Sequence, residues 1–188
     1  NYFKEVFGIE PYIQPNRDNS MNVIIGSKII ATLMHEICGT GFNTKYLRDI
    51  IMFANPDIQK YLLAGVIRGD GCAISNGYQL VLSNERLINQ IFQISLRCGL
   101  SPHMYNPYTS TLATTPGYTI VYNHIDKDFI NLVNKNINKI NFLSKIQLNN
   151  RFWYNNEYYM EIKNITNEEF EGTVYNFEVA NTHSYVVN

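Results

Sequence analysis

The sequence predicts an α+β fold in which helices alternate with pairs of short strands. Apolar residues recur at helical spacing over residues 87–96, as in an amphipathic helix. Residues 72–83 read as two strands joined by a tight turn at Asn76-Gly77, a dipeptide that favours hairpins. Two further strands are expected over residues 102–110 and 118–123.

An apolar, helix-like run over residues 63–71 precedes the first strand pair. Gly65 and Gly69 are four residues apart and fall on one helical face, with Ala64 beside them. A glycine in a helix interior costs roughly 1 kcal/mol relative to alanine. This face of nearly bare backbone therefore indicates close approach by a second helix. Gly71 suits a helix C-cap.

The remaining elements extend the pattern in a regular order. Ser83 or Asn84 offers an N-cap for the helix over residues 87–96, which closes at Gly99. A last helix is expected over residues 126–137, where apolar residues again recur at helical spacing. The predicted order is helix, two strands, helix, two strands, helix.

Residues 1–40 echo the second half of this pattern at an offset of about 91 positions. Residues 7–12 resemble residues 98–103, because each segment runs from a helix end through glycine into a strand. Residues 21–25 then stand where residues 118–122 stand, and residues 27–37 are the following helix, which ends at Gly39. Chance similarity is the alternative for so short an echo. If the repeat is real, the counterpart of Asp70 belongs roughly 20 residues before Asn1.

The run that ends at Gly71 resembles the signature of the LAGLIDADG homing endonucleases. Arg68 departs from that signature, which has an acid there, and a buried amphipathic helix with a glycine cap is the alternative interpretation. The resemblance implies the αββαββα repeat of that family, with Gly65 and Gly69 in the seam between two helices. It also implies hydrolysis of both strands of a long DNA site, with Asp70 as catalytic residue and ligand of Mg²⁺ or Mn²⁺. The matching residues are Leu63, Ala64, Gly65, Ile67, Asp70 and Gly71.

The same resemblance implies that the strands lie along the major groove of double-stranded DNA. The predicted strands contain no Lys or Arg, so they lack the usual anchors for phosphate, and weak binding is expected. Uncharged side chains remain for contacts with base edges. These candidates are Ser75, Gln79, His103, Tyr105, Asn106, Tyr108 and Thr119.

After about Lys145 the chain changes to short, aromatic-rich strands, which are expected over residues 151–154, 158–162 and 172–188. This ending resembles the penultimate sequence block of inteins, in which a histidine assists proton transfers at the splice junctions. The resemblance gives this role to His183, since a histidine titrates near neutral pH. Asn176 replaces the usual aspartate of the block, and an ordinary strand-end histidine is the alternative. The matching residues are Val174, Tyr175, Val179, His183 and Tyr185.

Together these patterns predict four regions. Residues 1–40 are the C-terminal half of a first LAGLIDADG repeat, 41–57 a linker, 58–140 a second repeat, and 141–188 the C-terminal part of an all-β Hint (intein splicing) domain. The expected function is a site-specific homing endonuclease embedded in an intein, with protein splicing by the flanking domain. The expected partners are double-stranded DNA, the missing N-terminal half of the intein and the exteins of the host protein.

Two other functions stay open at this point. The first is a catalytically inactive DNA-binding or structural remnant of such an endonuclease. The second is an intron-encoded maturase that uses the fold on RNA, although a maturase has no need of the splicing-like tail.

Composition sets further bounds. The 188 residues carry a net charge of −1, so no global basic field favours nucleic acid. The three cysteines form no C-x-x-C pair, which indicates reduced thiols in an intracellular protein, in the cytoplasm or nucleus of the host. The apolar run over residues 61–67 is far shorter than the ~20 residues that a bilayer requires, so no membrane partner is expected.

Overall fold

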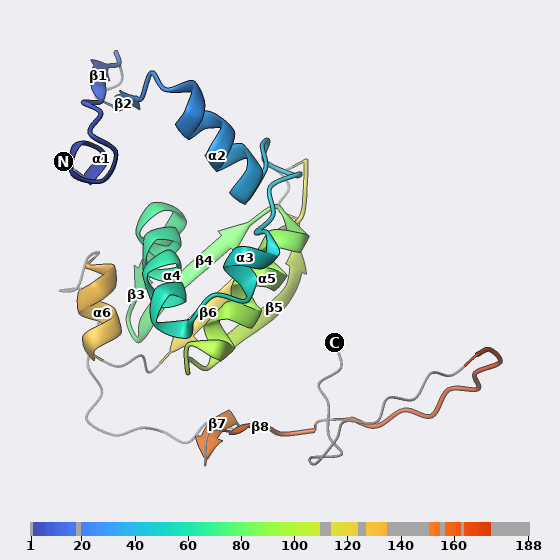
Figure 1. The fold of residues 1–188 in the computed structure, drawn as a ribbon. Helices are drawn as coiled ribbons and strands as arrows, with labels where there is room; N and C mark the ends of the chain where they lie inside the picture. Colours follow the sequence, from blue (N-terminus) through green and yellow to red (C-terminus); the bar gives the residue numbers. More distant parts are fainter. Residues whose placement is uncertain are drawn as a thin grey trace.

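A computed structural model of the chain shows a mixed α+β protein, as the alternation of helices and strand pairs predicts (Figure 1). Every strand pair among the described residues is antiparallel. The structure describes residues 2–17, 20–109, 114–123, 127–134, 151–154, 157–162 and 164–173.

The elements between residues 56 and 133 follow the predicted order of helix, two strands, helix, two strands and helix. Their strands form one sheet in the order β3-β4-β6-β5. The helices α4 and α5 lie across one face of this sheet, and α6 packs beside α4 (Figure 1). The elements are α4 (Pro56–Asp70), β3 (Gly71–Ile74), β4 (Gly77–Leu82), α5 (Glu85–Arg97), β5 (Pro102–Tyr108), β6 (Gly117–Asn123) and α6 (Lys127–Val133).

The main core fills the space between the sheet and these three helices. The two central strands pair Tyr78 with Tyr122 and Leu80 with Ile120, and all four side chains are fully buried. Burial raises the pKa of the Tyr122 hydroxyl, which lies 3.0 Å from the Oγ of Ser95. Buried residues of α4, α5 and α6 complete the core, among them Leu63, Ile67, Ile88, Ile91, Ile130 and Val133.

The first hairpin turns one residue earlier than expected. Ile74 pairs with Gly77, so Ser75 and Asn76 form the two-residue loop and the predicted turn at Asn76-Gly77 is wrong. The register explains the difference, because it directs Tyr78 into the core, and a slip by one residue would turn that side chain to the other face.

Helix α5 begins at the cap that the sequence offers. The Asn84 side chain accepts a hydrogen bond from the backbone N–H of Leu87 at 2.9 Å, and Glu85 lies in the first turn, where a negative charge favours the helix dipole. Gly99 follows the helix with a φ of 77°, a conformation that favours glycine. Of the last predicted helix, the structure shows α6, while residues 126 and 135–137 lie outside the described residues.

The segment expected to be a linker is packed onto α5. Residues 41–57 contain the short helix α3 (Asp49–Met52), and Leu47 is buried beside Ile94 and Cys98. The side chain of Gln90 accepts a hydrogen bond from the Leu47 N–H at 2.8 Å and donates one to its carbonyl at 2.7 Å. The chain path before α4 is thus fixed by a side chain of α5.

A buried glutamine fastens α3 to α4 and α5. Gln59 is 1% exposed, and its amide nitrogen donates to the carbonyls of Ile51 and Met52. Its amide oxygen accepts a hydrogen bond from Arg97 at 3.1 Å. Because a buried amide without partners would cost about 1–3 kcal/mol, this network is what makes the polar residue compatible with its position.

The N-terminal residues form a smaller unit of similar element order. Gly8 and Gly99, which the repeat aligns, both have positive φ angles, 67° and 77°. The Ser27 side chain caps α2 by accepting a hydrogen bond from the N–H of Ile30. Gly39 ends this helix, as the repeat predicts. The unit comprises α1 (Tyr2–Phe7), β1 (Tyr12–Pro15), β2 (Met21–Ile24) and α2 (Lys28–Cys38).

Toward the C-terminus, β7 (Arg151–Tyr154) and β8 (Glu157–Met160) form an antiparallel hairpin. Their positions match the first two aromatic-rich strands that the sequence predicts. His183 and the other residues of the intein-like block lie outside the described residues.

Gly71 is the C-cap of α4, as the sequence predicts, and its backbone N–H donates to the carbonyl of Ile67. Its φ of −79° and ψ of 163° are those of an extended strand residue, and it begins β3. The chain needs glycine there for space, because a Cβ on Gly71 would lie 2.6 Å from the carbonyl oxygen of Ile67.

The substitution Gly71→Ala is expected to lower the free energy of unfolding by about 1–3 kcal/mol, the usual cost of overpacking. Gly26→Ala is the matched control, since a Cβ there meets no atom within 4 Å. Urea denaturation of both variants checks the prediction. Equal stability of the two variants would contradict it.

Candidate functional site

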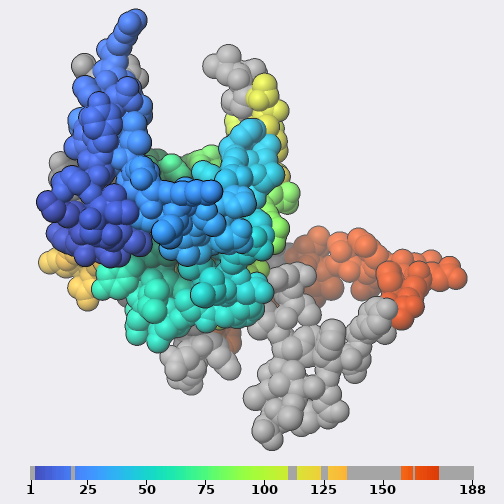
Figure 2. All heavy atoms as spheres, turned by 45° about the horizontal axis from the view of Figure 1, so that its top comes forward, coloured from blue at the N-terminus to red at the C-terminus, as the bar shows by residue number. Residues whose placement is uncertain are grey.

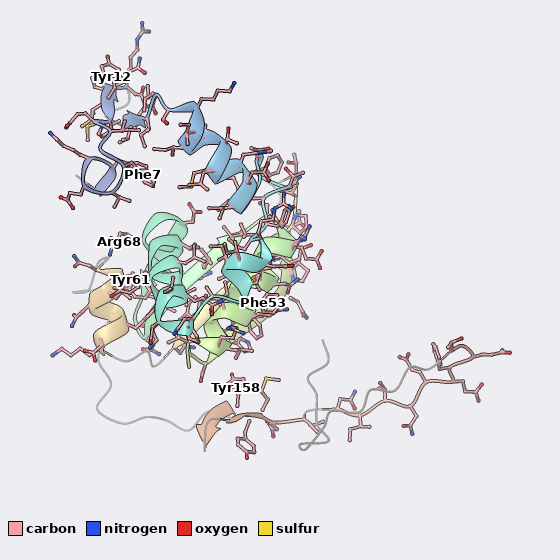
Figure 3. The ribbon with its side chains drawn as sticks, viewed as in Figure 1. Phe7, Tyr12, Phe53, Tyr61, Arg68 and Tyr158 are labelled. Carbon is pink, nitrogen blue, oxygen red and sulfur yellow. The ribbon has the colours of Figure 1, made fainter. Side chains whose placement is uncertain are left out.

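Helix α4 presents a bare strip of backbone on its exposed side. A Cβ added to Gly65 or Gly69 would meet no described atom within 4 Å. Tyr61 and Ile58 continue the strip toward the start of the helix and are 68% and 65% exposed. Figure 3 shows Tyr61 and Arg68 along this side of the helix. Among the described residues, none packs where a side chain at these two positions would lie.

Ala64 does not belong to this strip. It is 2% exposed and packs in the main core with Leu63 and Ile67, so its expected place beside the glycines is wrong. The reason is helical geometry, because successive residues turn by about 100° and Ala64 shares its face with Ile67, three residues on.

Asp70 is the last residue of α4 and is exposed to solvent. Its position directly before β3 puts a carboxylate where the helix meets an edge strand of the sheet. The described residues contain no group of three or more His, Cys, Asp or Glu side chains that could hold a metal ion. Mg²⁺ is commonly bound through one or two carboxylates plus water and substrate phosphate. Asp70 therefore fits one part of such a site.

Arg68 has a structural role that the sequence did not reveal. Its Nε donates to the carbonyl of Val133 at 2.9 Å and its Nη2 to that of Leu132 at 2.6 Å. The guanidinium thereby caps the C-terminal end of α6, where backbone carbonyls lack helical partners and the dipole favours a positive charge. The residue that departs from the LAGLIDADG signature is the one that fastens α6 to α4.

The open face of the sheet gathers most of the candidate DNA contacts. The register places Gln79 and His103 on either side of Val121, in a row across three strands. Tyr105 pairs with Thr119 in the next row. These positions alternate with the buried ones along each strand, so their side chains project from the sheet face opposite the helices. The rings of His103 and Tyr105 meet edge to face at 4.3 Å.

The other three candidates lie at the margins of this face. Ser75 is in the loop between β3 and β4. Tyr108 pairs with Gly117 and so belongs to the open face, whereas Asn106 lies in the irregular stretch where the register of β5 shifts. None of the four strands contains Lys, Arg, Asp or Glu, so the face offers shape, aromatic rings and amide or hydroxyl groups, with no formal charge.

No protein-family model matches this chain, and no curated protein shows significant sequence similarity to it. Among the described residues, no helix combines the length and apolar character needed to cross a membrane.

The substitution Gly65→Ala is expected to raise the free energy of unfolding of this chain by up to about 1 kcal/mol. The site is open, and alanine is the better helix former. Asn89→Ala is the control, because Asn89 is an exposed position of α5. Thermal denaturation of each variant measures the effect. A clear loss of stability in Gly65→Ala alone would mean that this strip is already covered.

Proposed function

We propose that this chain is part of an intein-embedded LAGLIDADG homing endonuclease that cuts double-stranded DNA. The observation that carries the proposal is the combination of an αββαββα order, a sheet ordered β3-β4-β6-β5 and a first helix that ends at Asp70. The uncovered glycine strip of that helix adds support. An approaching helix could come within backbone distance there, which is the use such small residues have in helix pairs.

In the proposed reaction Asp70 would be one of the residues that hold Mg²⁺ or Mn²⁺. A divalent ion supplies charge stabilisation to the phosphoryl oxygens and lowers the pKa of attacking water. The chain contributes the carboxylate at the end of α4, and the open sheet face orients the DNA through base-edge contacts from Gln79 and Thr119. A second helix of the same kind would deliver the second carboxylate.

The exposure of the N-terminal unit supports a missing first half-repeat. In the second repeat Met104 pairs with Ile120, which is fully buried under the helices. The aligned pair of the N-terminal hairpin is Ile13 with Val23, and these side chains are 56% and 60% exposed. A hairpin that leaves its apolar face in water is marginal by itself. The proposed upstream half would supply the helix and strands that cover this face.

The splicing part of the proposal depends on sequence alone. His183 lies outside the described residues, and the intein-like block around it defines its proposed role in proton transfer. The β7-β8 hairpin is compatible with the start of a small all-β domain.

A catalytically inactive DNA-binding or structural remnant is the second candidate. Two observations favour it: the four strands carry no Lys or Arg, and Arg68 is engaged with the carbonyls of Val133 and Leu132. Metal-independent DNA binding without cleavage would select this function over the nuclease.

For the nuclease we expect Asp70→Asn to reduce DNA cleavage by more than about 100-fold, since even outer-shell partners of a metal contribute 10–100-fold. The assay combines this chain with the proposed upstream half and measures nicking and linearisation of plasmid DNA with Mg²⁺. The plasmid carries the intein-free host sequence.

Asp57→Asn provides the matched control, because Asp57 is an acid of the same helix that pairs with Lys60 at the opposite end. Equal cleavage by the Asp70 and Asp57 variants would remove Asp70 from the active site. Binding without cleavage by the unmodified protein would leave the remnant as the function.

A further inference from the structure

Two guanidinium groups meet on the ring of Tyr46. The Cζ of Arg86 lies 3.9 Å from the ring centroid and that of Arg48 lies 4.8 Å from it. Arg48 belongs to the segment before α3, and Arg86 to the first turn of α5. Tertiary structure thus brings together two positive charges that are far apart in the sequence.

The ring that carries these groups is held in place by hydrogen bonds of its neighbours. The N–H of Tyr46 donates to the carbonyl of Cys38 at 3.1 Å. Asn84 Nδ2 donates to the carbonyl of Lys45 at 2.7 Å, and Gln90 bonds both backbone groups of Leu47. The residues on either side of Tyr46 are therefore fixed to the start of α5, and the ring is a firm support for stacking.

The two arginines differ in their acidic partners. Arg48 donates to the carbonyl of Glu36 at 2.9 Å, and its Nη2 lies 3.8 Å from the carboxylate of the same residue. Within the described residues Arg86 has no carboxylate at ion-pair distance. The neighbouring Glu85 accepts a hydrogen bond from Tyr118 at 3.1 Å. Arg86 is exposed. One face of its guanidinium stacks on the Tyr46 ring, and its N–H groups can donate to a ligand from the edge.

This pair of arginines lies at the end of the sheet where β4 leads into α5, on the side that the helices cover. Strand β4 ends at Leu82 and α5 begins at Glu85, and Tyr118 of β6 reaches Glu85 across this end. In Figure 2 the surface is hollowed between the N-terminal residues, in dark blue, and a column of light-blue and yellow residues from the segment before α3 and from β6. The four strands contain no Lys or Arg, so the positive charge that attracts a polyanion must come from residues beside the sheet.

We propose that Arg86 and Arg48, held on Tyr46, form a clamp for the phosphodiester backbone of duplex DNA at this end of the sheet. The inference rests on the proposed function for its ligand. Arginine suits the task because its fork of N–H donors matches two phosphate oxygens, and a stacked guanidinium loses little freedom on binding. The clamp supplies the sequence-independent attraction that the strand face lacks.

The test is the salt dependence of binding to a random-sequence DNA duplex, measured by fluorescence anisotropy on the full chain. Arg86→Gln is expected to reduce the slope of log K against log salt by about 0.9, the value for one phosphate contact. At a fixed salt concentration near 0.1 M, affinity is expected to fall about 10-fold. Arg86→Lys keeps the charge and is expected to restore the slope but not the full affinity.

Two further variants separate the clamp from general effects. Lys127→Gln removes one positive charge from the exposed start of α6, and its slope is expected to stay that of the unmodified chain. Tyr46→Leu removes the support without changing charge, so it is expected to lower affinity with an unchanged slope, whereas Tyr46→Phe binds normally.

The outcomes test the clamp separately from the nuclease. A slope that falls equally in Arg86→Gln and Lys127→Gln, or in neither, overturns the clamp, as does a failure of the unmodified chain to bind the duplex. Inorganic pyrophosphate and unlabelled DNA are also compared as competitors at the same concentration of phosphate groups. If pyrophosphate competes as strongly as DNA, the site binds free phosphate and the clamp is overturned. If the variants show the expected salt dependence but the protein does not cut DNA, the clamp is supported and the proposed nuclease function is wrong.

Discussion

Helix α4 packs on the sheet by one face and leaves the opposite face bare, and this packing sets the positions of the elements around it. Leu63, Ala64 and Ile67 enter the core above the sheet, and the glycine strip faces away from it. Because the chain passes directly from this helix into β3, Gly71 must lie against the carbonyl of Ile67. The position of Asp70 is a result of this packing, since Asp70 is the last residue of a helix fixed on the sheet and the next residue begins a strand of that sheet.

Polar side chains connect the helices to one another by hydrogen bonds, just as apolar side chains hold the core together. Gln59 links α3, α4 and Arg97 of α5, Gln90 holds the segment before α3, and Arg68 caps α6. The bonds made by Arg97, Gln90 and Arg68 join elements that are far apart in the chain, whereas those from Gln59 to α3 join neighbouring helices. The bonds of Gln59 and Gln90 explain how residues 41–57, expected to be a linker, become part of the fold. The bonds of Arg68 explain how α4 accommodates the residue that departs from the LAGLIDADG signature.

In the proposed function, the open sheet face and its margin would share the recognition of DNA. Uncharged residues such as Gln79 and Thr119 can distinguish bases but cannot attract a polyanion over distance. Charge is instead placed beside the sheet, on Arg48 and Arg86. A protein with a net charge of −1 gains a local positive region in this way without becoming basic as a whole.

The α+β class, the order of elements from residue 56 to 133 and a cap at Ser83 or Asn84 can be predicted from the sequence, because they follow from local periodicity, turn residues and capping chemistry. Packing between elements sets the choice of Asn84 as the cap, the bare face of α4, the turn at Ser75-Asn76 and the partners of Arg68. Helical periodicity leaves the exact position of a face uncertain by one residue, and strand register depends on the neighbouring strand. The pairing of Arg48 with Arg86 on Tyr46 could not be predicted at all, since it depends on residues brought together from separate elements by the packing of the segment before α3 onto α5.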